Sequence, residues 1–91
     1  MTTPPKDTAK LAAVLRSLKI HFRPYQRQGR CQLAMIGSFP MRIFTNLHEV
    51  FFWRDVFGRQ TCYAFAVITD SVENIAKRLS DILREYSGMQ R

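Results

Sequence analysis

Residues 49–68, EVFFWRDVFGRQTCYAFAVI, predict a β-hairpin, and this hairpin decides the fold class. Its two arms, residues 49–55 and 59–68, are rich in aromatic and β-branched side chains, which favour strands. Residues 56–58 connect them and end in Gly58, which adopts the positive φ of a tight turn at little cost. Apolar side chains fall on both faces of each arm, which is typical of strands covered on both sides. We therefore expect this hairpin to be covered on both faces of its sheet.

Upstream of the hairpin, between residues 19 and 48, the sequence keeps a period of two in shorter pieces. The apolar positions are Ile20, Phe22, Cys31, Leu33, Met35, Met41 and Ile43, and they alternate with Lys19, His21, Arg23, Arg30, Gln32, Ala34, Arg42 and Phe44. Pro24, Gly29 and residues 37–40 interrupt the pattern as turn residues do. Several short antiparallel strands are therefore expected, four or five in all, and one side of their sheet is repeatedly positive.

A helix is expected on each side of the strands. Residues 70–73 give a capping-box pattern, and an apolar stripe at helical spacing runs from Val72 to Tyr86. At the other end of the chain, Asp7 or Thr8 can cap a helix that ends near Leu18.

The predicted fold class is α+β, with an N-terminal helix, an antiparallel sheet of four or five strands, and a C-terminal amphipathic helix packed on the sheet. The chain of 91 residues is expected to form one domain over residues 7–88. Residues 1–6 are expected to be a flexible tail, and residues 89–91 a C-terminal tail. A domain of this size has a thin stability margin, so a second subunit would help it.

The charge of the chain is concentrated in its first half. Residues 8–48 contain no Asp or Glu but seven Lys or Arg, five of which are arginines. Residues 1–47 therefore carry the whole net charge of +7, whereas acidic and basic side chains balance in residues 48–91. Because such a field attracts and steers polyanions, the sequence indicates a nucleic acid or an acidic protein as the partner.

The leading functional hypothesis is a small basic module, without enzymatic activity, that binds RNA or single-stranded DNA through the positive face of its sheet. Cationic side chains would contact phosphates, and an aromatic ring would stack on an exposed base. Arginine suits both tasks, because its guanidinium binds phosphate through paired hydrogen bonds and stacks on bases. The residues predicted to bind nucleic acid are Lys19, His21, Arg23, Tyr25, Arg27, Arg30 and Arg42.

The alternative hypothesis is a protein–protein interaction subunit, an adaptor or an inhibitor, whose arginines bind an acidic partner. Phe51, Trp53 and Phe57 are the predicted interface residues, because some of these rings would otherwise form an exposed apolar patch. A homodimer formed through this surface would cover the patch and stabilise a small chain. Contact with anionic lipid ranks below both hypotheses, because neither predicted helix has a large exposed aromatic face.

Catalytic residues, metals and cofactors are not expected from the sequence. It contains no recognisable Ser, His and Asp set and no glycine-rich phosphate loop. His21, Cys31, His48 and Cys62 are 10, 17 and 14 positions apart, whereas structural zinc sites use short chelating pairs, so buried thiols are expected instead. Two cysteines, the absence of a signal-peptide pattern and the absence of a long apolar run favour a cytoplasmic protein.

Overall fold

The computed structural model describes residues 5–27, 30–37, 40–46 and 48–89, and these form two helices and five strands. In chain order the elements are α1 (Pro5–Ser17), β1 (Phe22–Arg27), β2 (Arg30–Met35), β3 (Met41–Thr45), β4 (Glu49–Val56), β5 (Arg59–Val67) and α2 (Val72–Met89). This confirms the predicted α+β layout and sets the number of strands at five. α1 begins at Pro5, which suits the first helical turn because no backbone N–H is needed there. Within the predicted tails, residues 1–4 and 90–91 lie outside the described part of the chain.

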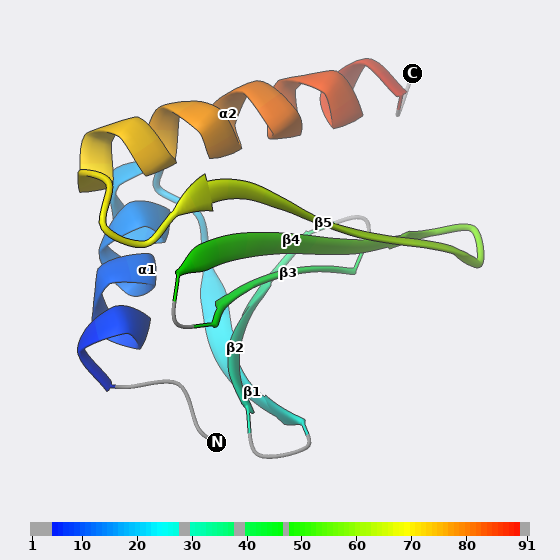
Figure 1. Ribbon diagram of the computed structural model, residues 1–91. Helices are drawn as coiled ribbons and strands as arrows, with labels where there is room; N and C mark the ends of the chain where they lie inside the picture. Colours follow the sequence, from blue (N-terminus) through cyan, green and yellow to red (C-terminus); the bar gives the residue numbers. More distant parts are fainter. Residues whose placement is uncertain (1–4, 28–29, 38–39, 47, 90–91) are drawn as a thin grey trace.

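The five strands form one antiparallel sheet in the order β1-β2-β3-β4-β5, so each strand pairs with its neighbour in the sequence and β1 and β5 are the edges (Figure 1). A β-bulge interrupts the last pairing, because Val50 lies opposite Ala66 whereas Phe51 lies opposite Ala64. Phe65 is the extra residue, and its ring packs edge-on against Phe52 at a centroid distance of 6.5 Å.

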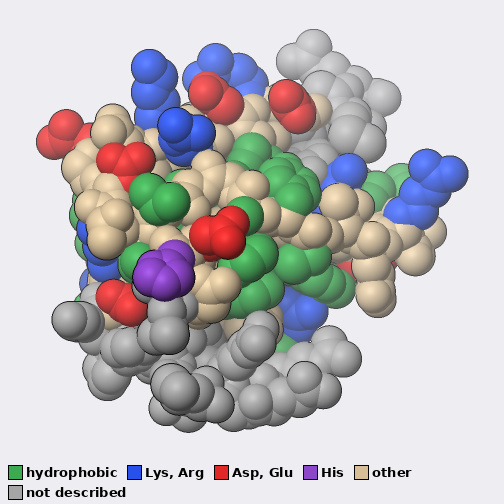
Figure 2. All heavy atoms as spheres, viewed as in Figure 1, with side chains coloured by type: hydrophobic (Ala, Val, Ile, Leu, Met, Phe, Trp, Pro, Cys, Tyr) green, Lys and Arg blue, Asp and Glu red, His purple; other side chains and the backbone are tan. Residues whose placement is uncertain are grey.

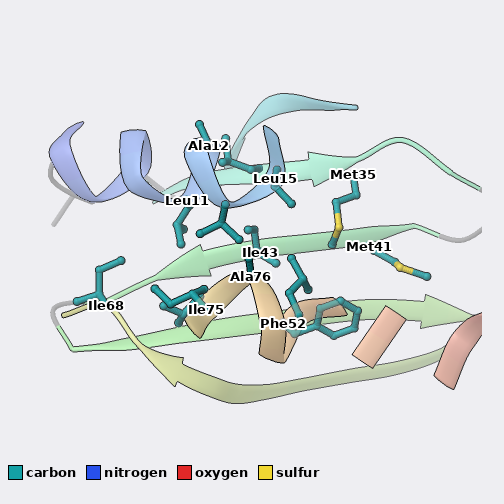
Figure 3. Close-up of a cluster of buried hydrophobic side chains, with 14 residues drawn as sticks. Leu11, Ala12, Leu15, Met35, Met41, Ile43, Phe52, Ile68, Ile75 and Ala76 are labelled. Carbon is teal, nitrogen blue, oxygen red and sulfur yellow. The ribbon is translucent and has the colours of Figure 1, made fainter. Parts of the chain in front are cut away.

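Both helices cover the same face of the sheet, and the hydrophobic core lies between them and the strands (Figure 3). The buried set consists of Leu11, Ala12, Val14 and Leu15 from α1, Leu33, Met35, Met41, Ile43, Val50 and Phe52 from the strands, and Ile68, Ile75, Ala76 and Leu79 from the C-terminal part. Each large side chain of this kind contributes roughly 1.5–3 kcal/mol by leaving water. In the described part of the chain, no helix covers the other face of the sheet, which we call the open face.

The connection between α1 and β1 corrects the predicted start of the first strand. Lys19 adopts the left-handed conformation, with φ 59°, and the Ile20 N–H donates to the Leu15 carbonyl at 3.0 Å. This pattern closes a helix at its C-terminus. Lys19 is therefore used to end α1, and β1 begins only at Phe22. His21 also precedes the strand.

Local side-chain chemistry fixes the start of α2 and the hairpin turn. The Ser71 hydroxyl accepts a hydrogen bond from the Asn74 N–H at 3.1 Å, so Ser71 is the cap of α2. Phe57 and Gly58 form the two-residue turn between β4 and β5, both with positive φ (52° and 82°). Asp55 accepts a hydrogen bond from the Gly58 N–H at 2.9 Å and so stabilises this turn.

Neither α1 nor α2, as far as the structure describes them, is long and apolar enough to cross a membrane.

Candidate binding face

Cationic and aromatic side chains of the open face are arranged in rows across the strands. The register places Arg23 opposite Ala34, Ala34 opposite Arg42, Arg42 opposite Trp53, and Trp53 opposite Cys62. This central row crosses all five strands. Because side chains alternate between the faces of a sheet, the central row lies on the face opposite to the helices.

A second row lies beside the central row. On β3, β4 and β5 it contains Phe44, Phe51 and Ala64, and on β1 and β2 it contains Tyr25 opposite Gln32. The rings of Phe44 and Phe51 are stacked, with centroids 5.3 Å apart and planes at 13°. A further flat group, such as a nucleobase or a partner's aromatic ring, can extend such a stack.

Arg42 lies at the middle of the central row and is stacked between two aromatic rings. Its guanidinium carbon is 3.7 Å from the centroid of the Trp53 ring and 4.5 Å from the centroid of the Tyr25 ring. Cation–π contacts of this kind contribute roughly 0.5–2 kcal/mol each. The Tyr25 ring from β1 and the Trp53 ring from β4 therefore hold the Arg42 guanidinium between them.

Arg42 is buried, although it is a basic side chain on the open face. Only 8% of the residue is exposed, and no described carboxylate forms an ion pair with it. The Arg42 Nε has no hydrogen-bond partner, and neither does the buried Oε1 of Gln32. Buried charges in proteins are normally paired, because removing a charge from water costs several kcal/mol. Among the described residues, Arg42 thus has aromatic contacts but no counter-ion, and its Nε and the Gln32 Oε1 lack hydrogen-bond partners on the open face.

An open cavity of about 470 Å³ lies at the β1 and β2 end of the central row. It is lined by Arg23, Ala34, Met35, Ile36, Gly37, Pro40 and Met41. The Arg23 side chain is exposed, so its guanidinium can meet an anion that reaches this end of the row. Arg23 and Arg42 are two strands apart, which is roughly 10 Å in a sheet.

Cys62 occupies the β5 end of the central row. Its thiol is exposed, which corrects the expectation of a buried thiol. Partial burial raises the pKa of the Cys62 thiol, and the positive charge of Arg42 lowers it in part. The charge of Arg42, at the centre of the open face, therefore affects the ionisation of the Cys62 thiol.

The structure brings together five of the predicted functional residues and separates others. Arg23, Arg42 and Trp53 lie in the central row, and Tyr25 and Phe51 lie in the second row. Lys19 and His21 are exposed but precede β1. The backbones of Arg27 and Arg30 pair with each other across β1 and β2, and their side chains lie outside the described part of the structure. Phe57 lies at the tip of the hairpin and is 91% exposed, so it is apart from the other two predicted interface residues.

Sequence reasoning considered Phe44, like Tyr25 and Trp53, as a ring on which a base could stack, but it did not select Gln32 or Cys62, although both lie on the open face. Alternation within residues 30–35 and 41–45 already placed Gln32 and Phe44 on the same side as Arg42. What the alternation could not show was which rings would contact the arginine.

Comparison of the chain with protein families, with curated proteins and with solved structures finds no match. Among the residues that the structure describes, no three His, Cys, Asp or Glu side chains lie together as a metal site would require.

Proposed function

We propose that this chain is a non-enzymatic module that binds single-stranded RNA or DNA on the open face of its sheet. The observation that carries the proposal is Arg42, a buried cation stacked between Tyr25 and Trp53 without a counter-ion among the described residues. A phosphate group of the ligand would supply the missing anion. Hydrogen bonds between ionised groups are stronger than neutral ones, and more so where water is excluded.

The composition of the two rows supports a nucleic acid as ligand. None of their residues is a carboxylate, so the two rows themselves carry no negative charge that would repel a phosphate backbone. The carboxylates of this face, Glu49 and Asp55, lie on β4 outside the two rows. The rings beside Arg42 offer contact to bases, and single-strand-binding proteins combine cations with aromatic rings in this way. Because the bases of a duplex are already stacked on one another, a single strand suits these rings better.

The test uses Trp53, which is the only tryptophan of the chain and lies on the open face. Its fluorescence is followed while short single-stranded RNA, single-stranded DNA and a duplex of the same sequence are added at several salt concentrations. We expect single strands to change the Trp53 emission at low salt. The affinity should fall steeply with salt, because each phosphate contact releases bound counter-ions.

Two charge reversals provide a matched comparison. Arg23→Glu changes an exposed cation at the end of the central row, and Lys77→Glu changes an exposed cation on α2, with the same effect on net charge. Arg23→Glu should weaken binding by about tenfold or more, the loss of a charged contact of about 1.5–3 kcal/mol. Lys77→Glu should weaken it only slightly. Equal effects of the two variants, or no binding of any nucleic acid at low salt, would refute the proposal.

A second candidate ligand is an acidic protein, which would act through the same arginines. Exposed apolar side chains favour it, because Phe57 is 91% and Ile36 is 63% exposed, and buried apolar anchors dominate many protein interfaces. In this case Phe57→Ser would abolish partner binding and leave the fold intact. Salt would then change the association rate more than the final affinity.

A further inference from the structure

We propose that two copies of this chain pair through their β5 edges and form one continuous antiparallel sheet. This inference does not depend on the nature of the ligand. β5 is nine residues long, forms an edge of the sheet and has six exposed residues. An antiparallel strand turns alternate N–H and C=O groups away from its neighbour, so an edge strand offers them to another chain.

The two edges of the sheet differ in the features that prevent such pairing. β1 contains Pro24 next to Arg23, and proline and charged side chains are the residues by which proteins protect an edge. β5 contains no proline, and from Gln60 to Val67 it has no charged side chain. Aromatic and β-branched residues, which favour strands, occupy several of these positions. By its own residues, β5 is therefore the less protected of the two edges.

A second copy is the partner that this edge fits. The chain carries a net charge of +7, so two copies repel each other wherever cations meet, but residues 60–69 are uncharged. Antiparallel pairing about Tyr63, the midpoint of β5, places Arg59 of one copy opposite Val67 of the other. The two Arg59 residues then stay roughly 26 Å apart along the strands. Pairing also places the two Tyr63 side chains, each 36% exposed, opposite each other.

The layer of helices is compatible with this arrangement. α2 lies over β5, and Figure 2 shows Lys or Arg and Asp or Glu side chains side by side along it. Two α2 helices brought together by the dimer can therefore pair opposite charges. Hydrophobic side chains are visible at the surface between α2 and the tip of the hairpin. A twofold axis perpendicular to the sheet keeps both helix layers on one side and both open faces on the other, so the two Arg42 residues would share one surface.

The experiment measures molar mass by light scattering and sedimentation from about 1 to 200 µM. We expect a reversible dimer of twice the 10.6 kDa of one chain. Ala64→Lys and Ala64→Glu place a charge on an exposed residue next to the midpoint of β5. In the dimer these two charges lie about 7–8 Å apart, diagonally across the strand pair. Each variant alone should dimerise at least threefold more weakly than the wild type.

A mixture of the two Ala64 variants should form heterodimers in preference to either homodimer, as counted by native mass spectrometry. Ala9→Lys and Ala9→Glu, at an exposed position of α1, are the matched controls and should leave dimerisation unchanged. Hydrogen exchange on the wild type gives a second readout that needs no variant. The β5 amides should gain protection as concentration rises, and the β1 amides should not. A monomer at all concentrations, a dimer insensitive to charge at residue 64, or protection at β1 instead of β5 would overturn the proposal.

Discussion

Arg42 and Trp53 face each other across β3 and β4, with the guanidinium carbon 3.7 Å from the centroid of the indole ring. The only tryptophan of the chain is thus in contact with the only buried arginine among the described residues. A cation at this distance attracts anions to the ring. The charge of Arg42 should therefore affect how strongly charged solutes quench Trp53 fluorescence.

Replacing Arg42 with methionine should reduce quenching of Trp53 by iodide and leave quenching by neutral acrylamide almost unchanged. The guanidinium attracts the iodide anion to the ring, and methionine has a similar length without the charge. The free energy of unfolding should change by no more than about 1 kcal/mol, because loss of the cation–π contacts is offset by loss of an unpaired buried charge. Urea titration measures the free energy of unfolding. A large loss of stability would assign Arg42 to the fold rather than to binding.

Alkylation of Cys62 should be slow at neutral pH although the thiol is exposed. Partial burial raises the pKa of Cys62, so the reactive thiolate is scarce, and Arg42 only partly offsets this. The measurement is the pH dependence of the iodoacetamide rate in a Cys31→Ser background. Arg42→Met should move the inflection to higher pH, because it removes the charge that favours the thiolate. An inflection at or below that of a free thiol would contradict the assignment.

Ser71→Ala should destabilise the protein by about 1 kcal/mol, because the Ser71 hydroxyl satisfies the Asn74 N–H at the start of α2. Ser80→Ala is the control, since Ser80 lies within the same helix, where alanine is favoured. Thermal or urea unfolding compares the two variants. If Ser71→Ala and Ser80→Ala lower the free energy of unfolding equally, the hydroxyl of Ser71 is not acting as the cap.

Asp70 should give the protein a pH-dependent stability that Asp70→Asn lacks. The pKa of this carboxyl is lowered, chiefly by the hydrogen bond from the Asn74 side chain and then by that from the Ser71 N–H. A lowered pKa in the folded state means that the contribution is present above the unfolded value of about 3.9 and is lost as pH falls below it. Urea unfolding at pH 7 and near pH 3 measures this. The difference between wild type and variant should shrink at the lower pH.

The hairpin turn should respond in opposite ways to two substitutions. Gly58→Ala places a Cβ at φ 82° and should cost about 1–2 kcal/mol. Phe57→Asn should keep or slightly raise the stability, because Phe57 is 91% exposed and Asn-Gly is the preferred pair for this turn. Urea titrations of both variants provide the comparison. A strong loss in Phe57→Asn would show that the ring packs on the domain in solution.

Much of the fold could be predicted from local patterns in the sequence. The alternation through residues 41–45 correctly placed Met41 and Ile43 in the core and Arg42 on the other face, because a strand has a strict period of two. Gly58 likewise marked the turn, and the capping pattern of residues 70–73 marked the start of α2, although Ser71 is the residue that caps it. The beginning of β1 was missed, because the left-handed conformation of Lys19 ends α1 and is rarely adopted by a lysine.

The candidate site was less predictable, because it depends on contacts between strands that are distant in the sequence. The burial of Arg42 could not be predicted, since nothing local shows that Tyr25 and Trp53 approach it from two sides. Phe51, Trp53 and Phe57 were grouped by their proximity in the sequence. The turn instead places Phe57 at the end of the hairpin and the other two rings on the sheet.

The strand order and the contact between α1 and α2 also set the order in which the chain can fold during synthesis. Each strand meets its neighbour as soon as the next hairpin is made, so these steps are local and fast. The core closes only when α2 brings Ile75 and Leu79 into the buried cluster that also contains Val50 and Phe52. A nascent chain that ends before α2 therefore presents a sheet whose apolar face is covered only in part, by α1. We expect such a chain to depend on chaperones until its last helix has left the ribosome.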